Sequence, residues 1–497
     1  MLAQKLVLSY ITKIAAQLLQ MIALFIVARI VGPGVLGTLA FGLAFVSMFL
    51  FVADLGLTSA HVKLISEGQD EASSIGTFSV LKTGVNILFA LVVFGYYLIQ
   101  KYVLGIAFES SEQETVIFIY LIITFIGQFF RIPGTTFAAK TEQAKQDIPI
   151  FLQTFLFQLF RVIAALIGLR AIGIAFSNLL AVLLVIPVYF YLFKDYKVGK
   201  YSRELAKKYF AISLPVLIII IVQAGMYSTD RVILQYLSNS VEVGYYSAGF
   251  SISQFIKLIE SSAGLLFFPL FSNLLARGEY EKLNSDINKY ERFNVVFILP
   301  LVAAVSISSD VVVKIALGKE FAGTVPVLGL LSISMYVSLV NLPYINLISG
   351  KGLFKLSAII YVCCLPIYVI TTYFLVSPSF FGLKGIGIAL SLIIVNIALG
   401  LLFVYNAKKK VPEIKIVKDK ILFAYGIGLS LVYLLVYRLL PEGFILHIIS
   451  SSVFLVAYFV IGYMLKLFKR EDYRMAMELL NSKKMLNYIN KEIANKN

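Results

Sequence analysis

The stretch Gly168–Ser177 reads GLRAIGIAFS, and a close copy, GLKGIGIALS, follows 214 residues later at Gly382–Ser391. Seven of the ten positions are identical, and an eighth exchanges Arg for Lys. Self-similarity at a long period is the first sign of a duplicated architecture and is tested before a fold is assigned.

Two weaker matches recur in the same order at nearly the same separation. Ile132-Pro133 and Leu342-Pro343 each end an apolar run, and Val35-Leu36-Gly37 and Glu242-Val243-Gly244 each lead into one. The sequence therefore predicts two homologous halves, joined at a basic seam near residues 194–208.

Composition places both halves in a membrane. The 497 residues are 60% hydrophobic and 14% charged, with a mean hydropathy of +0.90, whereas soluble domains average about 45–50% apolar and about 25% charged residues. Adjacent Cys363 and Cys364 and the distant His61 and His447 build neither a disulfide framework nor a metal site. The net charge of +16 points to the membrane surface and not to nucleic acid.

Runs of about 20 apolar residues predict spanning helices. About fourteen are expected, at 10–30, 36–60, 76–99, 115–137, 149–169, 172–193, 209–234, 243–270, 292–316, 324–349, 355–376, 384–406, 420–440 and 444–467. The expected fold is all-α and integral to the membrane, with two six-helix lobes, 1–208 and 209–419, two additional helices, 420–468, and a cytoplasmic tail, 469–497.

Lys and Arg concentrate in alternate connections, including the seam and the segments after 408 and 466. The positive-inside rule then places both termini in the cytoplasm, with Arg131 counted among the cytoplasmic loop residues. Six helices per half give parallel repeats, an arrangement that favours a substrate site between two lobes and alternating access. A plasma-membrane location follows, with the basic tail against anionic lipid.

Polar residues inside the predicted helices mark candidate sites. A cationic cavity for an anionic substrate is expected to use Lys13, Gln17, Gln20, Lys82, Arg161 and Lys257. Ion coupling is expected at Asp54, Asp230 or Glu260. Six of these residues have a simpler alternative: Lys13 and Lys82 reach the headgroups, Lys257 and Glu260 neutralise each other, and Asp54 and Asp230 sit at helix ends.

No Walker A sequence and no acid–base pair for glycosyl transfer is found, so a transporter without catalytic residues, metal or cofactor is expected.

Several segments resemble the polysaccharide-transporter branch of the MOP flippase superfamily. They are Ala28–Leu39 (ARIVGPGVLGTL), Asp54–Leu57 (DLGL), Asp230-Arg231 and Val243–Ala248 (VGYYSA). The resemblance implies a flippase for oligosaccharide linked to polyprenyl phosphate or pyrophosphate, acting in surface polysaccharide or cell-envelope glycan synthesis. It also implies contact with membrane lipids and with glycan polymerases or glycosyltransferases of the same pathway.

By position, the similar lipid II flippases make Lys13 and Lys257 candidate headgroup contacts. Arg29 is the only arginine in the first two helices, a departure from the lipid II pattern. Two alternatives stay open: a multidrug and toxin extrusion antiporter, which usually has twelve helices, and a membrane glycan polymerase or ligase, which needs a large outer loop.

Overall fold

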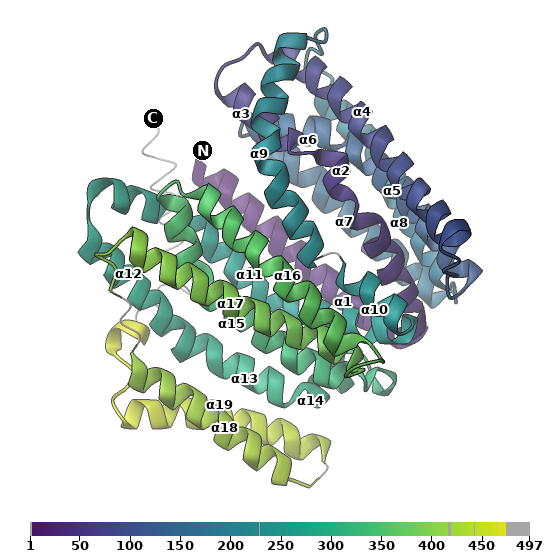
Figure 1. Ribbon diagram of the computed structural model, residues 1–497. Helices are drawn as coiled ribbons and strands as arrows, with labels where there is room; N and C mark the ends of the chain where they lie inside the picture. Colours follow the sequence, from purple (N-terminus) through teal and green to yellow (C-terminus); the bar gives the residue numbers. More distant parts are fainter. Residues whose placement is uncertain (1, 228, 416–418, 442, 474–497) are drawn as a thin grey trace. The chain divides into compact units, whose positions relative to one another are not determined.

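Apolar runs with few helix-breaking residues favour helices, and the computed structural model contains no strand in the part of the chain that it describes (Figure 1). It describes residues 2–473 except 228, 416–418 and 442, and side chains from residue 12 onward with gaps inside 203–227 and 240–277. Among these residues, 11 helices are long and apolar enough to cross a bilayer. The prediction of an all-helical membrane protein is therefore confirmed.

Among the described residues, those up to 247 form one compact unit, and those from 248 to 473 form a second. The helices of the first unit are α1 (Leu2–Ser47), α2 (Leu50–Asp54), α3 (Leu57–Ser66), α4 (Glu71–Leu98) with a π-helical turn η1 (Ile99–Val103), α5 (Ser111–Phe129), α6 (Arg131–Ala139), α7 (Gln143–Leu166), α8 (Ala171–Phe193), α9 (Arg203–Tyr227) and α10 (Asp230–Leu237).

Three of the expected spans are interrupted in this unit. The run at 36–60 is interrupted where Leu55 (φ 46°) and Gly56 (φ 81°) separate α2 from α3. A kink at Gly32 (φ 74°) inside α1 precedes this run. The run at 115–137 changes from α5 to α6 at Phe130, and the run at 209–234 is divided between α9 and α10. Helix discontinuities at membrane depth free backbone groups, which is tolerated where protein or a cavity satisfies them.

The two segments matched in sequence at Gly37 and Gly244 pack on each other. A Cβ on Gly37 would lie 1.7 Å from the carbonyl oxygen of Ser240, and a Cβ on Gly244 would lie 2.0 Å from that of Pro33. Because the sequence match pairs Pro33 with Ser240 and Gly37 with Gly244, the contact is reciprocal, as in an interface around a twofold axis. Only glycine permits this approach of α1 to the first turns of α11.

The second unit holds the remaining helices. They are α11 (Ser240–Arg277), whose first turns belong to the first unit, α12 (Tyr280–Phe293), a π-helical turn η2 (Asn294–Ile298), α13 (Leu299–Ile307), α14 (Ser309–Ala316), a 3₁₀ turn η3 (Lys319–Phe321), α15 (Thr324–Gly350), α16 (Phe354–Val376), α17 (Lys384–Lys410), α18 (Lys420–Leu439) and α19 (Phe444–Met464).

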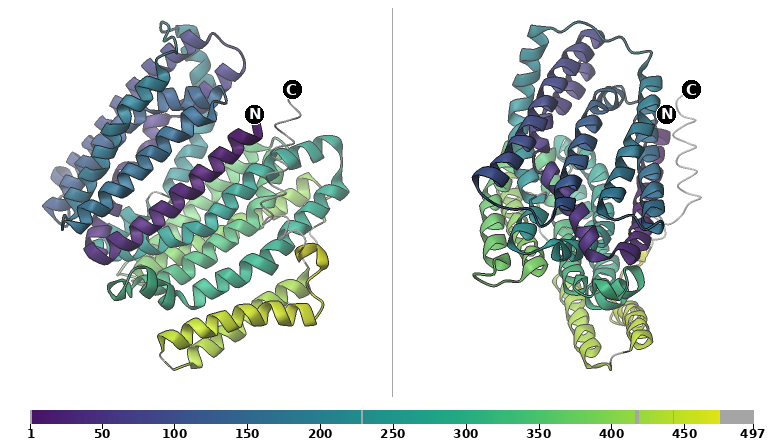
Figure 2. Two further views of the ribbon diagram at one scale, coloured as in Figure 1. Left: turned by 180° about the vertical axis from the view of Figure 1, so that it is seen from behind. Right: turned by 90° about the vertical axis from the view of Figure 1, so that its right-hand side faces the viewer.

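The last two helices form a hairpin, with α18 and α19 side by side (yellow-green in Figures 1 and 2). Large apolar side chains such as Leu435 and Val456, each 63% exposed, cover its outer surface, as expected for lipid contact. Its inner face packs on α13 and η2 through an aromatic cluster that includes Tyr433, Phe454 and Tyr458.

Polar bonds fix the hairpin at three levels. In the middle, the Tyr458 hydroxyl donates to the carbonyl oxygen of Val295 in η2 (2.7 Å). Near the end of α18, the Tyr437 hydroxyl donates to Asp310 (2.5 Å), and His447 Nδ1 lies 3.0 Å from the same carboxylate. At the beginning of α18, the third connection is made by Arg292.

Arg292, 4% exposed, joins α12 to both ends of the hairpin. Its guanidinium donates to Asp419 (2.6 Å), which caps α18, to Asp472 (2.6 and 3.0 Å) and to the carbonyl oxygen of Leu467 (2.9 Å). The hairpin is therefore attached to the second unit by buried, charge-assisted bonds. Of the expected tail, 469–497, the structure describes residues 469–473, and the remainder lies outside the described residues.

Candidate functional site

The break between α2 and α3 organises a charged cluster in the first unit (α2, α3, α4 and α6 in Figure 1). Asp54 is the last residue of α2, and the left-handed Leu55 and Gly56 turn the chain into α3. A Cβ on Gly56 would lie 2.6 Å from the carbonyl oxygen of Ser213, so the bend requires glycine where α9 packs against it. The bend leaves backbone carbonyls without helical partners.

Lys82 of α4 satisfies this break. Its ammonium donates to the carbonyl oxygen of Ala53 (2.7 Å) and to Asp54 Oδ1 (3.2 Å), and its side chain is 1% exposed. The Thr58 hydroxyl donates to the same carboxylate oxygen. A buried ammonium inside a spanning helix is costly unless it is paired in this way. The expected substrate contact Lys82 and the expected coupling group Asp54 are therefore partners.

A second cation, Arg131, completes the cluster. It begins α6 at the junction with α5, inside the candidate span Ser111–Ala139, and its side chain is exposed. It lies close enough to Lys82 for the two positive charges to repel each other. No hydrogen bond or ion pair joins its guanidinium to the described residues. With Asp54 the three charges sum to one net positive charge.

The depths of the two cations agree. At 1.5 Å per residue, Lys82 lies about 16 Å from the first residue of α4, and Arg131 about 12 Å from the last residue of α6. The two helices contact each other and run in opposite senses. The sequence analysis counted Arg131 with the cytoplasmic loop residues, although the expected run 115–137 contains it. The structure places it at the first residue of α6, inside the candidate span Ser111–Ala139, and Pro133 is tolerated because it lies in the first turn of that helix.

Arg161 forms a separate cationic position on α7. Its Nε and the Oε1 of Gln158, one turn earlier, are buried and have no hydrogen-bond partner in the described part of the chain. The guanidinium lies 5.9 Å from the centre of the Phe157 ring and beside the buried Tyr120 of α5. Buried polar groups of native proteins are nearly always hydrogen-bonded, so two adjacent groups without a partner indicate that a ligand or a water molecule binds there.

The other expected residues differ in their exposure. Lys13 and Gln20 are exposed and Gln17 is half-buried on α1. Lys257 is half-buried on α11 in the second unit. The side chain of Glu260 lies outside the described residues.

Asp230 is 2% exposed and accepts from the Tyr246 hydroxyl (2.6 Å) and from Arg231 (3.1 Å). Its bonds link α10 to α11.

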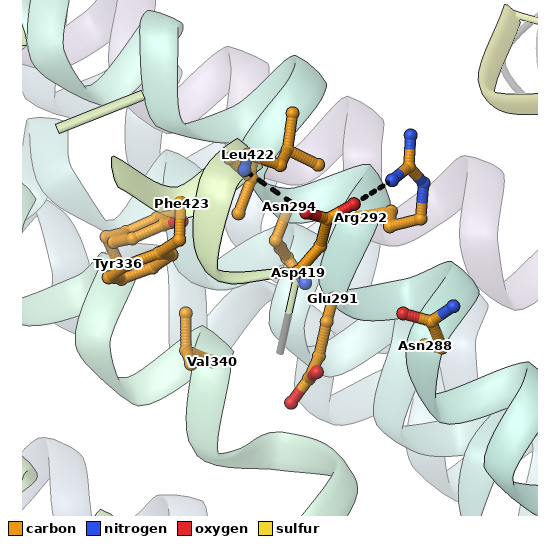
Figure 3. Close-up of a pocket in the computed structure, with 10 residues that line it drawn as sticks. Asn288, Glu291, Arg292, Asn294, Tyr336, Val340, Asp419, Leu422 and Phe423 are labelled. Carbon is orange, nitrogen blue, oxygen red and sulfur yellow. Dashed lines mark hydrogen bonds and ion pairs between the residues drawn. The ribbon is translucent and has the colours of Figure 1, made fainter. Parts of the chain in front are cut away.

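The second unit contains a recess that the sequence did not indicate (Figure 3). Its cavity volume is about 30 Å³, and its lining comes from α12, η2, α15 and the start of α18. Figure 3 shows Asp419 at its centre, joined by dashed lines to Arg292 and to the backbone of Leu422. Tyr336 and Phe423 contribute aromatic rings to the wall.

Comparison with known proteins agrees with this architecture. The model of a family described as polysaccharide biosynthesis protein matches residues 26–326. A putative O-antigen transporter of Shigella flexneri is 21% identical over 401 residues, covering 78% of this chain and 93% of that protein.

Two solved structures have a similar fold. The lipid II flippase MurJ in an inward closed conformation has a TM-score of 0.71 at 15% identity, covering 93% of this chain and all of that one. An inward-facing multidrug resistance MATE transporter of the MOP superfamily has a TM-score of 0.61 at 15% identity, covering 80% and 96%. The chain thus belongs to the polysaccharide biosynthesis protein family and is a multi-pass membrane transporter with a MOP-like fold.

Proposed function

We propose that this protein is a flippase that carries oligosaccharide linked to polyprenyl phosphate or pyrophosphate across the plasma membrane by alternating access. The family and the O-antigen transporter relative support a glycan substrate. The observation that carries the proposal is the exposed Arg131 beside the buried Lys82–Asp54 pair, at a helix break within the membrane-spanning part of the first unit.

The chemistry of this cluster suits a phosphate. A guanidinium presents five donors in a planar fork that matches phosphate oxygens, and it keeps its charge when it is partly desolvated. The ammonium of Lys82 already donates to Ala53 and Asp54. In this proposal its positive charge attracts the phosphate without a direct hydrogen bond. In this proposal Arg131 is the direct contact, and Arg161, with its unpartnered Nε, is a second contact along the path.

The proposed topology has fourteen spanning helices and both termini in the cytoplasm. The helices form two parallel lobes, 1–208 and 209–419, followed by two additional helices in 420–468. The reciprocal contact of Gly37 and Gly244 supports the duplication. Outward movement of each negative charge would gain about 2.3 kcal/mol per 100 mV of inside-negative potential. Lys13, Gln17, Gln20 and Lys257 remain candidate contacts, and Asp54 and Glu260 candidate coupling groups.

A test uses purified protein in liposomes that contain a fluorescent polyprenyl-pyrophosphate oligosaccharide, with the outer label quenched chemically. The expected result is that quenching of the inner pool accelerates in protein-containing vesicles. Efflux of organic cations driven by a proton or sodium gradient, without movement of the glycan lipid, would instead establish the antiporter alternative. Elongation of the glycan would establish the polymerase alternative.

A further inference from the structure

The turn after α19 holds a lysine in an unusual backbone conformation. Lys466 has a φ of 56°, in the left-handed region. The N–H of Leu467 donates to the carbonyl oxygen of Gly462 (3.0 Å), a bond that ends many helices, and glycine is the usual residue at the left-handed position of this motif. The Cβ of a lysine is strained there. Such strain is retained where the surrounding structure or a function requires the residue.

An apolar groove lies on both sides of this lysine in the chain. Its volume is about 590 Å³, within the range of about 300–1,000 Å³ that is typical of ligand sites. It is lined by Lys420, Ile421, Ala424, Tyr425, Leu465 and Leu467. Ile421 is 70% exposed and Leu465 is 58% exposed. The groove is therefore open to the surroundings of the hairpin, at the end where α18 begins and α19 has ended (Figure 1).

The lining offers a ligand apolar walls and a positive charge. The Tyr425 hydroxyl donates to the carbonyl oxygen of Tyr458, so its hydrogen atom is already used. Lys420 and Lys466 are exposed, and neither forms an ion pair with a described residue. Lysine stems can lie along apolar surface while the ammonium groups stay at its polar edge. These properties fit an anion that is attached to a hydrocarbon chain.

The neighbouring charges favour an anion as well. Asp419 and Asp472 both accept from Arg292 (2.6 Å each), so their charges are compensated. Glu471 is the other carboxylate of the segment 465–473. The basic side chains in the groove segments and directly after them are Lys420, Lys466, Lys469 and Arg470, all exposed. Because these cations outnumber the remaining carboxylate, a cationic ligand would be repelled and an anionic one attracted.

The depth of the groove selects a lipid. The 20 residues of α18 extend about 30 Å, the thickness of the hydrocarbon core, so Lys420 at its first residue lies at the level of the headgroups. The lining residues of α18 cover about 8 Å of helix, which accommodates a glycerol backbone and the first methylenes of a chain.

We propose that this groove binds a net-negative glycerophospholipid of the phosphatidylglycerol type. Its phosphate lies at Lys420 and Lys466, and one acyl chain begins along Ile421 and Leu465. With the topology proposed above, this end of α18 faces the cytoplasmic leaflet, which is the anionic one. The bound lipid holds the end of the hairpin in the bilayer.

Native mass spectrometry of the full-length protein tests this proposal. The protein is released from micelles that contain equal amounts of phosphatidylglycerol and phosphatidylcholine with the same acyl chains. The wild type is expected to retain phosphatidylglycerol preferentially, because the choline ammonium cancels the charge of the phosphate. Equal retention of the two lipids, or a preference for phosphatidylcholine, would overturn the proposal.

Two variants connect the preference to the lysines. Lys420→Gln and Lys466→Gly each remove one charge and should lower the preference for phosphatidylglycerol about fivefold, the contribution of one lysine near anionic lipid. The matched control, Lys408→Gln, changes an exposed lysine near the end of α17, outside the groove, and should keep the preference. A preference unchanged in both groove variants would overturn the assignment.

Lys466→Gly also separates lipid binding from folding. Glycine is unstrained at a positive φ, so this variant should melt at the same temperature as the wild type, or higher, in detergent without phospholipid. A lower melting temperature there would show that Lys466 supports the fold itself and would contradict its assignment to the lipid.

A third variant locates the lipid. Ala424→Trp fills the groove and should lower the retained phosphatidylglycerol to the level of phosphatidylcholine. Val456→Trp adds the same bulk at an exposed position of α19 outside the groove and should leave the preference unchanged. The same retention in both tryptophan variants would place the lipid elsewhere and overturn the proposal.

A soluble anion and a polyprenyl phosphate are the competing occupants. Retention of phosphatidylglycerol against millimolar pyrophosphate and against equimolar polyprenyl phosphate is expected. Displacement by pyrophosphate would show a site for soluble anions, and displacement by polyprenyl phosphate would assign the groove to the carrier of the glycan; either result contradicts the phospholipid assignment. Because no glycan lipid has to be moved, the outcome does not depend on the flippase proposal.

Discussion

The reciprocal glycine contact predicts the outcome of two alanine substitutions. In Gly37→Ala the new Cβ would lie 1.7 Å from the carbonyl oxygen of Ser240 and 2.8 Å from the backbone nitrogen of Gly244. Ordinary contacts of a Cβ lie at 3.4–4 Å. The first turns of α11 would therefore have to move more than an ångström away from α1. Gly244→Ala meets the same obstacle at 2.0 Å from Pro33.

Overpacking of a fitted interface costs about 1–3 kcal/mol, and a clash with backbone on both helices belongs at the upper end of that range. A loss of about 3 kcal/mol in a unit of this size lowers its melting temperature by roughly 6–12 °C. Gly34→Ala is the matched control, three residues earlier on α1. Its Cβ would meet only Val241 Cγ2, at 3.7 Å, and alanine is the better helix former by about 0.5–1 kcal/mol.

The assay is thermal unfolding of the purified variants, followed by the fraction that remains monodisperse after heating. Gly37→Ala and Gly244→Ala should unfold at lower temperature than the wild type, and Gly34→Ala at the same or a higher temperature. If Gly37→Ala were as stable as Gly34→Ala, the close approach of the two repeats would be refuted.

Three further predictions concern charged groups. Lys82→Met should destabilise by about 3–5 kcal/mol, because Asp54 loses its partner, and adding Asp54→Asn should restore much of that stability; a double variant no better than the single one would contradict the pairing. Arg292→Met should accelerate hydrogen exchange after α19, since the buried Asp472 is left unpaired, whereas uniform exchange along the chain would contradict a local clamp. Burial opposes the charge of Glu109, but hydrogen bonds from Ser240 and Gln235 outweigh this effect and lower its pKa below the ordinary 4.5. The contribution of Glu109 to folding stability is therefore present above pH 4.5 and is lost as the pH falls through the lowered pKa. Melting temperatures measured across that range should show this loss in the wild type and not in Glu109→Gln.

Periodicity and composition were sufficient for the helical membrane architecture, because bilayer thickness sets the length of an apolar helix. They could not predict the interruptions. The αL conformation at Leu55 depends on Lys82 of another helix to satisfy the carbonyl of Ala53, and no local pattern reports that partner. Gly56 was the one available signal, since glycine inside an apolar run often marks a break.

The candidate site was accessible from the sequence only in part. Intramembrane charge identified Lys82, Asp54 and Arg161, but their pairing depends on tertiary contact. Arg131 was missed because the count of basic residues under the positive-inside rule assigned it to a cytoplasmic loop, and only tertiary contact places it beside Lys82. The Arg292 clamp joins residues more than a hundred positions apart, and the recess beside it appears only once α12, α15 and α18 are packed together.

The central claim is that unpaired arginines in the first unit contact the phosphate of a glycan lipid. The most direct measurement is the initial rate of transbilayer movement of a fluorescent polyprenyl-pyrophosphate oligosaccharide, in liposomes with Arg131→Gln, Arg161→Gln or Arg170→Gln. Arg170 is an exposed arginine before α8 and serves as the control. We predict rates about tenfold lower for Arg131→Gln and Arg161→Gln, the effect of one lost charge-assisted bond, and an unchanged rate for Arg170→Gln. Wild-type rates in all three folded variants would contradict the account.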